Sequence, residues 1–221
     1  MIPPEQNAAF VWRMEEILDL YEEPYDPRHP VVCFDERPCR LLSEVREPLP
    51  AKPGKPARFD SEYQRRGTAH VLMAFEPLAG WRHLSVSKHR RKCEFAEFMR
   101  YLAEEAYPQA ERVRVVMDNL NTHTPSAFYE FFDAERARRL VRKLEFVYTP
   151  VHGSWLNMVE IELSVLVRQC LRRCLPDMET LGGEAEAWEA ERNRFGASVD
   201  WRFTTPNART KLRRLYPSID H

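Results

Sequence analysis

The second half of the chain alternates short apolar segments with longer amphipathic ones, and this alternation limits the possible folds more than any other feature. Residues 112–118 and 144–150 are rich in β-branched and aromatic side chains, which is typical of strands. Residues 93–108, 125–143 and 154–175 carry apolar side chains three and four positions apart, which predicts helices. Because strands joined through helices usually pair in parallel, we expect a parallel section of sheet covered by helices.

The first half predicts antiparallel pairing instead. Residues 67–77 and 81–87 have the composition of two strands joined by a short turn, and residues 31–35 form another short strand with 39–45 as its hairpin partner. Residues 46–59 contain four prolines and one glycine, which predicts an extended connection. Together the two halves predict the α/β class, with a mixed sheet flanked by helices.

Length and composition indicate one medium-sized globular unit. The chain has 221 residues, of which 43% are hydrophobic. We expect an N-terminal helical segment at 1–28, a core at 29–176 and a C-terminal helical extension at 177–221 that packs on the core. No apolar run approaches the ~20 residues that a membrane span needs, and no secretory signal is visible, so we expect a cytoplasmic protein without a membrane partner.

Cysteine content and charge exclude some classes of protein. The five cysteines include no CxxC pair, which argues against a zinc site or a disulfide framework. A net charge of −1 argues against a protein that coats nucleic acid indiscriminately. Basic runs nevertheless occur at 88–92, 136–143, 168–173 and 211–215. Each alone is most often a solvated helix face, but four on one chain favour local contacts with nucleic acid.

Three acidic residues stand where a metal site could form. Asp35 and Asp118 each follow a short apolar strand, and Glu160 lies early in the helix predicted at 154–175. Ligands gather at the carboxyl ends of strands in open α/β sheets. Three carboxylates brought together repel one another unless cations neutralise them, and Mg²⁺ prefers oxygen ligands. The alternative is that each aspartate caps a turn.

Helical periodicity leaves the third acidic residue undecided. At about 100° per residue, Glu160 and Glu162 lie on opposite flanks of the apolar stripe between Val159 and Leu163. Only one of the two can face a given cleft. Asn157, three residues before Glu160, lies on the same flank as Glu160.

Three segments resemble a known family. The stretches "VVCFDE", "VVMDNLNTHT" and "YTPVHGSWLNMVEIELSVL" are similar to the catalytic domain of Asp-Asp-Glu (DDE) transposases of the mariner superfamily, and in particular to its bacterial insertion-sequence branch of the IS-six-thirty type. The resemblance extends over residues 3–217 and includes "EPLAGWRH", "WEAERN" and "VDWRFT".

The resemblance implies a fold, a reaction and roles for individual residues. The fold would be ribonuclease-H-like, with five strands in a mixed sheet, and Asp35, Asp118 and Glu160 would be the catalytic residues that hold two Mg²⁺ or Mn²⁺ ions; this favours Glu160 over Glu162. The reaction would cut DNA at the ends of a mobile element and join it to a target, commonly at TA, with the chain acting as a homodimer. Supporting residues would be Asn119, Asn121, His123 and Asn157, and DNA contacts would come from Lys88, Arg90, Arg91, Lys92, Arg168, Arg172 and Arg173.

The chain also departs from the family pattern. Members usually carry an N-terminal helix-turn-helix region that recognises the element ends, whereas residues 1–30 contain a single predicted helix. Two other functions are therefore considered. One is a catalytically decayed DNA-associated or dimerisation module, and the other is a ribonuclease-H-type nuclease that acts on hybrids or branched DNA.

Overall fold

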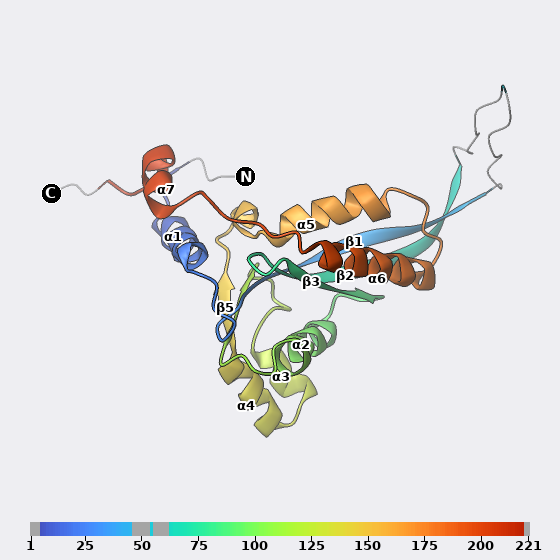
Figure 1. Ribbon diagram of the computed structural model, residues 1–221, viewed down its shortest axis with the longest axis horizontal. Helices are drawn as coiled ribbons and strands as arrows, with labels where there is room; N and C mark the ends of the chain where they lie inside the picture. Colours follow the sequence, from blue (N-terminus) through green and yellow to red (C-terminus); the bar gives the residue numbers. More distant parts are fainter. Residues whose placement is uncertain (1–4, 46–53, 55–61, 219–221) are drawn as a thin grey trace.

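A mixed five-stranded sheet forms the centre of the protein. The computed structural model describes residues 5–45, 54 and 62–218, and the strand order is β3-β2-β1-β4-β5 (Figure 1). β1 (Val31–Glu44), β2 (Tyr63–Glu76) and β3 (Trp81–Ser87) are antiparallel neighbours. β4 (Val113–Met117) and β5 (Leu144–Tyr148) extend the sheet in parallel with β1. The predicted α/β class and mixed sheet are confirmed.

The first strand differs from the prediction. β1 is one strand of 14 residues, so the expected hairpin between 31–35 and 39–45 is wrong, and its antiparallel partner is β2. Pro38 lies within this strand, and pairing with β4 ends at Cys33. Beyond that point this part of β1 has the character of an edge, where a residue without an N–H is tolerated. Asp35 therefore lies inside the strand rather than at its end. The connection expected at 46–59 lies outside the described residues, apart from Gly54.

Helices cover both faces of the sheet. Side chains that alternate along β1 and β4 point to opposite faces, so Cys33 and Val116 join one core and Phe34 and Val115 join the other. The first core is closed by α1 (Ala8–Glu22), α5 (Val159–Leu166) and α6 (Met178–Phe195), and the second by α2 (Lys92–Tyr101), α3 (Ser126–Phe131) and α4 (Ala134–Lys143) (Figure 1). None of the described helices is long and apolar enough to cross a bilayer.

Several predicted helices have different bounds. The helix expected at 125–143 is divided into α3 and α4, because the side chain of Asp133 caps α4 by accepting from the backbone N–H of Arg136 at 2.8 Å. α2 continues as a π-helical turn, Leu102–Ala106. The helix expected at 154–175 is a 3₁₀ turn (Ser154–Leu156), then α5, then a π-helical turn (Val167–Leu171).

The C-terminal part packs on the rest of the protein at two places. α6 runs unbroken through Gly182 and Gly183. α6 packs against β3, while α7 (Thr205–Lys211) and the 3₁₀ turn Arg213–Leu215 pack against α1. The segment boundaries proposed at 28/29 and 176/177 stay predictions.

Glu162 connects α5 to α6 and β3 through ion pairs with arginines. Its side chain is 1% exposed and accepts from Arg192, with Nη2 2.9 Å from Oε1 and Nε 3.0 Å from Oε2. Nε of the fully buried Arg82 on β3 lies 3.3 Å from Oε2. Arg82 also donates to three backbone oxygens, those of Gly80, Arg192 and Ala197. Glu162 is therefore committed to holding α5, α6 and β3 together.

We expect Glu162→Gln to lower the free energy of unfolding by about 3 kcal/mol, because it leaves the buried Arg82 and the part-buried Arg192 without their counter-charge. Denaturant unfolding measures this change. The matched control is Glu186→Gln, the same substitution at an exposed position of α6, which should stay within about 0.5 kcal/mol of the wild type. Equal stability of the two variants would contradict the structural role given to Glu162.

Candidate active site

Parallel pairing of β1 with β4 places two aspartates side by side. The last paired residues are Cys33 and Val116, and Asp35 and Asp118 each follow two positions later. Because side chains alternate along a strand, Asp35 is directed to the face of Cys33 and Val116, which is the face that α5 covers. Asp118 bonds to His123, whose ring packs on Phe95 of the opposite core. Asp118 lies one residue beyond the end of β4, as predicted, whereas Asp35 lies within β1 rather than at its end.

The third carboxylate, Glu160, is held in the first turn of α5 by a contact to β1. Asn157 is 2% exposed, and its Nδ2 donates to the backbone oxygen of Phe34 at 2.8 Å. The backbone oxygen of Asn157 accepts from the N–H of Glu160 at 3.1 Å. The start of α5 is thus fixed against the residue that precedes Asp35. The structure places Asn157 between two of the predicted site residues, as a support for both elements.

The pKa of Asp35 responds to the charges of Asp118 and Glu160. The pKa of Asp35 is raised to about 7, first by burial and also by the charges of Asp118 and Glu160, while two interactions oppose this rise. One is a hydrogen bond from the backbone N–H of Glu36 to Oδ1 at 2.7 Å, and the other is the charge of His123. Asp35, Asp118 and Glu160 therefore lie within electrostatic reach, and their negative charge is only partly compensated.

The donor set fits a hard divalent cation. Carboxylate oxygens are the ligands that Mg²⁺ and Mn²⁺ prefer, and a cation would offset the mutual repulsion of the three side chains. Within 5–45, 54 and 62–218, no three His, Cys, Asp or Glu side chains are arranged closely enough to hold a metal ion in their present conformations. The chemistry of the donors matches such an ion, while coordination would require the side chains to close around it.

His123 joins Asp118 to a buried residue that sequence reasoning missed. Its Nδ1 lies 2.7 Å from Oδ1 of Asp118, and its Nε2 lies 3.2 Å from Oε1 of Glu36. Burial lowers the pKa of His123, but the hydrogen bonds and charges of the two carboxylates outweigh it and raise the pKa to about 9. Two signals in the sequence could have found Glu36: it ends the "VVCFDE" stretch, and it lies two residues after Phe34, where strand alternation directs it into the core.

The other predicted residues are distributed unevenly. Asn119 and Asn121 are exposed on the loop between Asp118 and His123. Three of the seven basic residues predicted to contact DNA form ion pairs with carboxylates within the protein: Arg90 with Glu36, Lys92 with Glu130 and Arg173 with Glu184. The remaining four are exposed and available to a ligand: Lys88, Arg91, Arg168 and Arg172.

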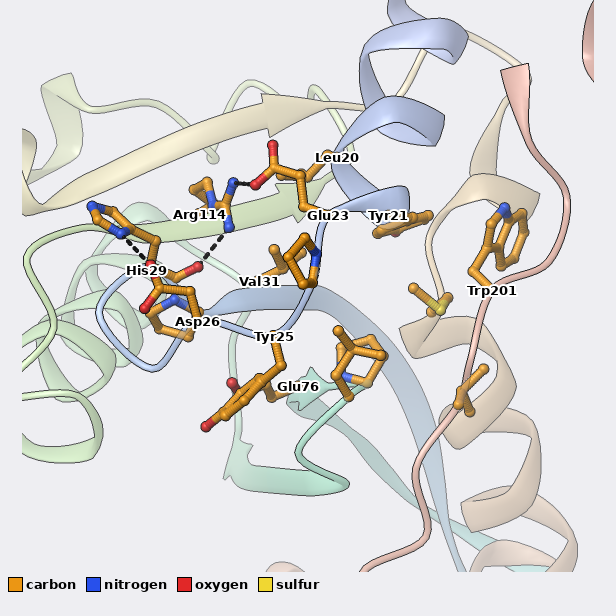
Figure 2. A pocket seen from close by; sticks show the side chains of 16 residues that line it. Leu20, Tyr21, Glu23, Tyr25, Asp26, His29, Val31, Glu76, Arg114 and Trp201 are labelled. Carbon is orange, nitrogen blue, oxygen red and sulfur yellow. Dashed lines mark hydrogen bonds and ion pairs between the residues drawn. The ribbon is translucent and has the colours of Figure 1, made fainter. Parts of the chain in front are cut away.

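A separate pocket lies at the opposite end of the parallel strands. Figure 2 shows Tyr21, Tyr25 and Trp201 around it, next to Val31 at the start of β1 and Arg114 near the start of β4. Its charged groups are largely paired with each other: Arg114 with Glu23, and His29 with Asp26 at 2.9 Å. Asp35, Asp118 and Glu160 are not among the residues that line this pocket, so it is distinct from the candidate active site.

Comparison with solved structures shows the same fold in a transposition protein. The chain matches a pre-cleavage Mos1 transpososome with a TM-score of 0.60 at 15% identity, covering 100% of this chain and 66% of that one. It matches the Mos1 mariner paired end complex with Mn with a TM-score of 0.58 at 17% identity, covering 89% of this chain and 61% of that one. It matches the Mos1 Strand Transfer Complex with a TM-score of 0.56 at 16% identity, covering 89% of this chain and 60% of that one. The predicted ribonuclease-H-like fold is confirmed. The chain spans less than two thirds of the length of these proteins.

Sequence comparison assigns the family. No curated protein matches the chain significantly. The family model described as "DDE superfamily endonuclease" matches residues 30–182, a range that contains Asp35, Asp118 and Glu160 together with the Asn157 that supports them. Since the match extends over more than half of the sequence, the chain belongs to the DDE superfamily endonucleases.

Proposed function

We propose that this chain is the catalytic domain of a transposase, which cleaves DNA and joins the freed strand end to a target with the help of divalent metal ions. What supports the proposal is the position of Asp35 in β1, of Asp118 directly after β4 and of Glu160 in α5, together with the effect of Asp118 and Glu160 on the pKa of Asp35. Family membership and the shared fold with Mos1 complexes, one of them with Mn and one after strand transfer, support it.

The proposed roles follow from the contacts of each residue. Asp35, Asp118 and Glu160 would hold two Mg²⁺ or Mn²⁺ ions. Such ions lower the pKa of an attacking water or 3′-hydroxyl and stabilise the departing oxygen. Asn157 fixes the position of Glu160 relative to Asp35 through its bond to Phe34. Exposed cations would bind DNA phosphates and set the position of the duplex: Lys88, Arg91, Arg168 and Arg172.

The proposal extends to the branch of the transposase superfamily to which the chain belongs. The motifs around Asp35, Asp118 and Glu160 support membership of the bacterial insertion-sequence branch of the IS-six-thirty type. With that branch come a TA target, a homodimer and a cytoplasmic location, each of which is part of what we propose.

The electrostatic cost of the site favours an active enzyme over a decayed module. Burial and like charges raise the pKa of Asp35, so keeping this side chain ionised costs folding free energy. An element under no catalytic constraint would gain stability by losing one of the carboxylates. The presence of all three, with Asn157 in place, supports a working centre.

Removal of a single carboxylate tests the proposed reaction. We expect Asp118→Asn and Glu160→Gln each to reduce Mn²⁺-dependent nicking of duplex DNA by about 1,000-fold, because metal-ion catalysis contributes several kcal/mol. Gel assays with supercoiled plasmid measure the rate. Glu186→Gln is the matched control and should nick at the wild-type rate. Preferential cutting of an RNA–DNA hybrid by the wild type would instead favour the nuclease alternative.

The charge of the site predicts a response of stability to metal. We expect Asp35→Asn to raise the free energy of unfolding of the metal-free protein by about 1–3 kcal/mol, because it removes a buried, repelled charge. Addition of Mn²⁺ should raise the melting temperature of the wild type by several degrees and have a smaller effect on this variant. Differential scanning calorimetry measures both quantities.

Asp200→Asn, at an exposed position, serves as the control for that substitution and should respond to Mn²⁺ as the wild type does. An identical Mn²⁺ response in Asp35→Asn and the wild type would show that Asp35 does not participate in binding the ion.

A further inference from the structure

Glu36 is a buried carboxylate that the proposed reaction does not yet use. It follows Asp35 directly on β1, but strand alternation directs it to the opposite face, beside Phe34 and the core that α2 and α3 close. Its side chain is 1% exposed. Burial of an unpaired carboxylate lowers the stability of a protein. The groups that pair with Glu36 therefore indicate its role.

The contacts of Glu36 form a chain that ends at Asp118. Oε1 of Glu36 lies 3.2 Å from Nε2 of His123, and Nδ1 of His123 lies 2.7 Å from Oδ1 of Asp118. Oε2 of Glu36 has no hydrogen-bond partner among the described residues, and Nε of Arg90 lies 3.5 Å from it. The imidazole is therefore placed between two carboxylates, one on each ring nitrogen.

The ring of His123 is also confined by its neighbours. His123 is fully buried, and its ring stacks on Phe95 with centroids 4.9 Å apart and an interplanar angle of 27°. Phe34 meets it edge-on, with centroids 5.4 Å apart. With its plane fixed by two aromatic rings, the direction of its two N atoms is set by Glu36 at one end and Asp118 at the other.

We propose that Glu36 is a positioning residue for Asp118, acting through His123. It holds the imidazole so that His123 engages Oδ1 of Asp118, which leaves Oδ2 of Asp118 as the oxygen for a divalent cation. The inference rests on the proposed metal-dependent function and adds a residue to it. Outer partners that orient a ligand in this way typically change metal affinity or activity by about 10- to 100-fold when removed.

The chain offers a matched control for a purely structural role. Glu76, at the end of β2, is also a buried carboxylate at 4% exposure. One of its oxygens accepts from the hydroxyl of Tyr107 at 2.9 Å, and the other has no partner among the described residues. Glu76→Gln therefore repeats the chemical change and the burial of Glu36→Gln at a position without a path to Asp118.

The test is Mn²⁺ binding by the full chain in the absence of DNA, measured by isothermal titration calorimetry. We expect Asp118→Asn to abolish binding, Glu36→Gln to weaken it by about 10-fold or more, and Glu76→Gln to bind as the wild type does. Thermal unfolding of each variant confirms that it is folded. If Glu36→Gln does not fold, Glu36→Met replaces it, because an apolar side chain of similar volume is better tolerated in a core.

A double-variant cycle tests whether Glu36 acts through His123. We expect His123→Gln and the Glu36→Gln/His123→Gln double variant to bind Mn²⁺ with equal affinity, because the second change removes an interaction already lost. Additive losses would overturn the proposal.

Two further outcomes separate this inference from the proposed function. Wild-type affinity in Glu36→Gln, with binding lost in Asp118→Asn, would overturn the role of Glu36 and leave the metal site intact. Absence of Mn²⁺ binding by the wild type itself would contradict both.

Discussion

The parallel pairing of β1 with β4 is the constraint on which the rest of this structure depends. Its register brings Asp35 beside Asp118, although 82 residues lie between them in the chain. The third carboxylate reaches the same place because Asn157 bonds to the backbone of β1 next to Asp35. A shift of one residue in the strand register would direct Asp35 away from α5 and separate the acidic side chains.

Neighbouring acidic residues have different roles because local geometry directs them to different surroundings. Asp35 and Glu36 are adjacent on one strand, yet one faces α5 and the other faces His123. Glu160 and Glu162 are two positions apart on one helix, yet Glu162 is enclosed by two arginines whereas Glu160 influences Asp35. Glu162 is paired with two cations, whereas Asp35 lies near the negative charges of Asp118 and Glu160.

The sequence predicts the class of fold and the general position of the site, because both follow from local patterns. The apolar run before Asp118 and the periodicity around Val159 and Leu163 are visible without any tertiary information. The extent of β1 and the role of Glu36 are not, since they depend on which strand pairs with which and in what register. Periodicity alone left Glu160 and Glu162 open, and the ion pairs of Glu162 with Arg82 and Arg192 depend on residues that are distant in the sequence.

The central claim is that three carboxylates from separate elements bind the same metal ions. Anomalous diffraction from crystals of the protein grown with Mn²⁺ measures this most directly. The account predicts one or two anomalous peaks within about 2.5 Å of carboxylate oxygens of Asp35, Asp118 and Glu160. Peaks at other carboxylates only, with none at these three residues under saturating Mn²⁺, would contradict it.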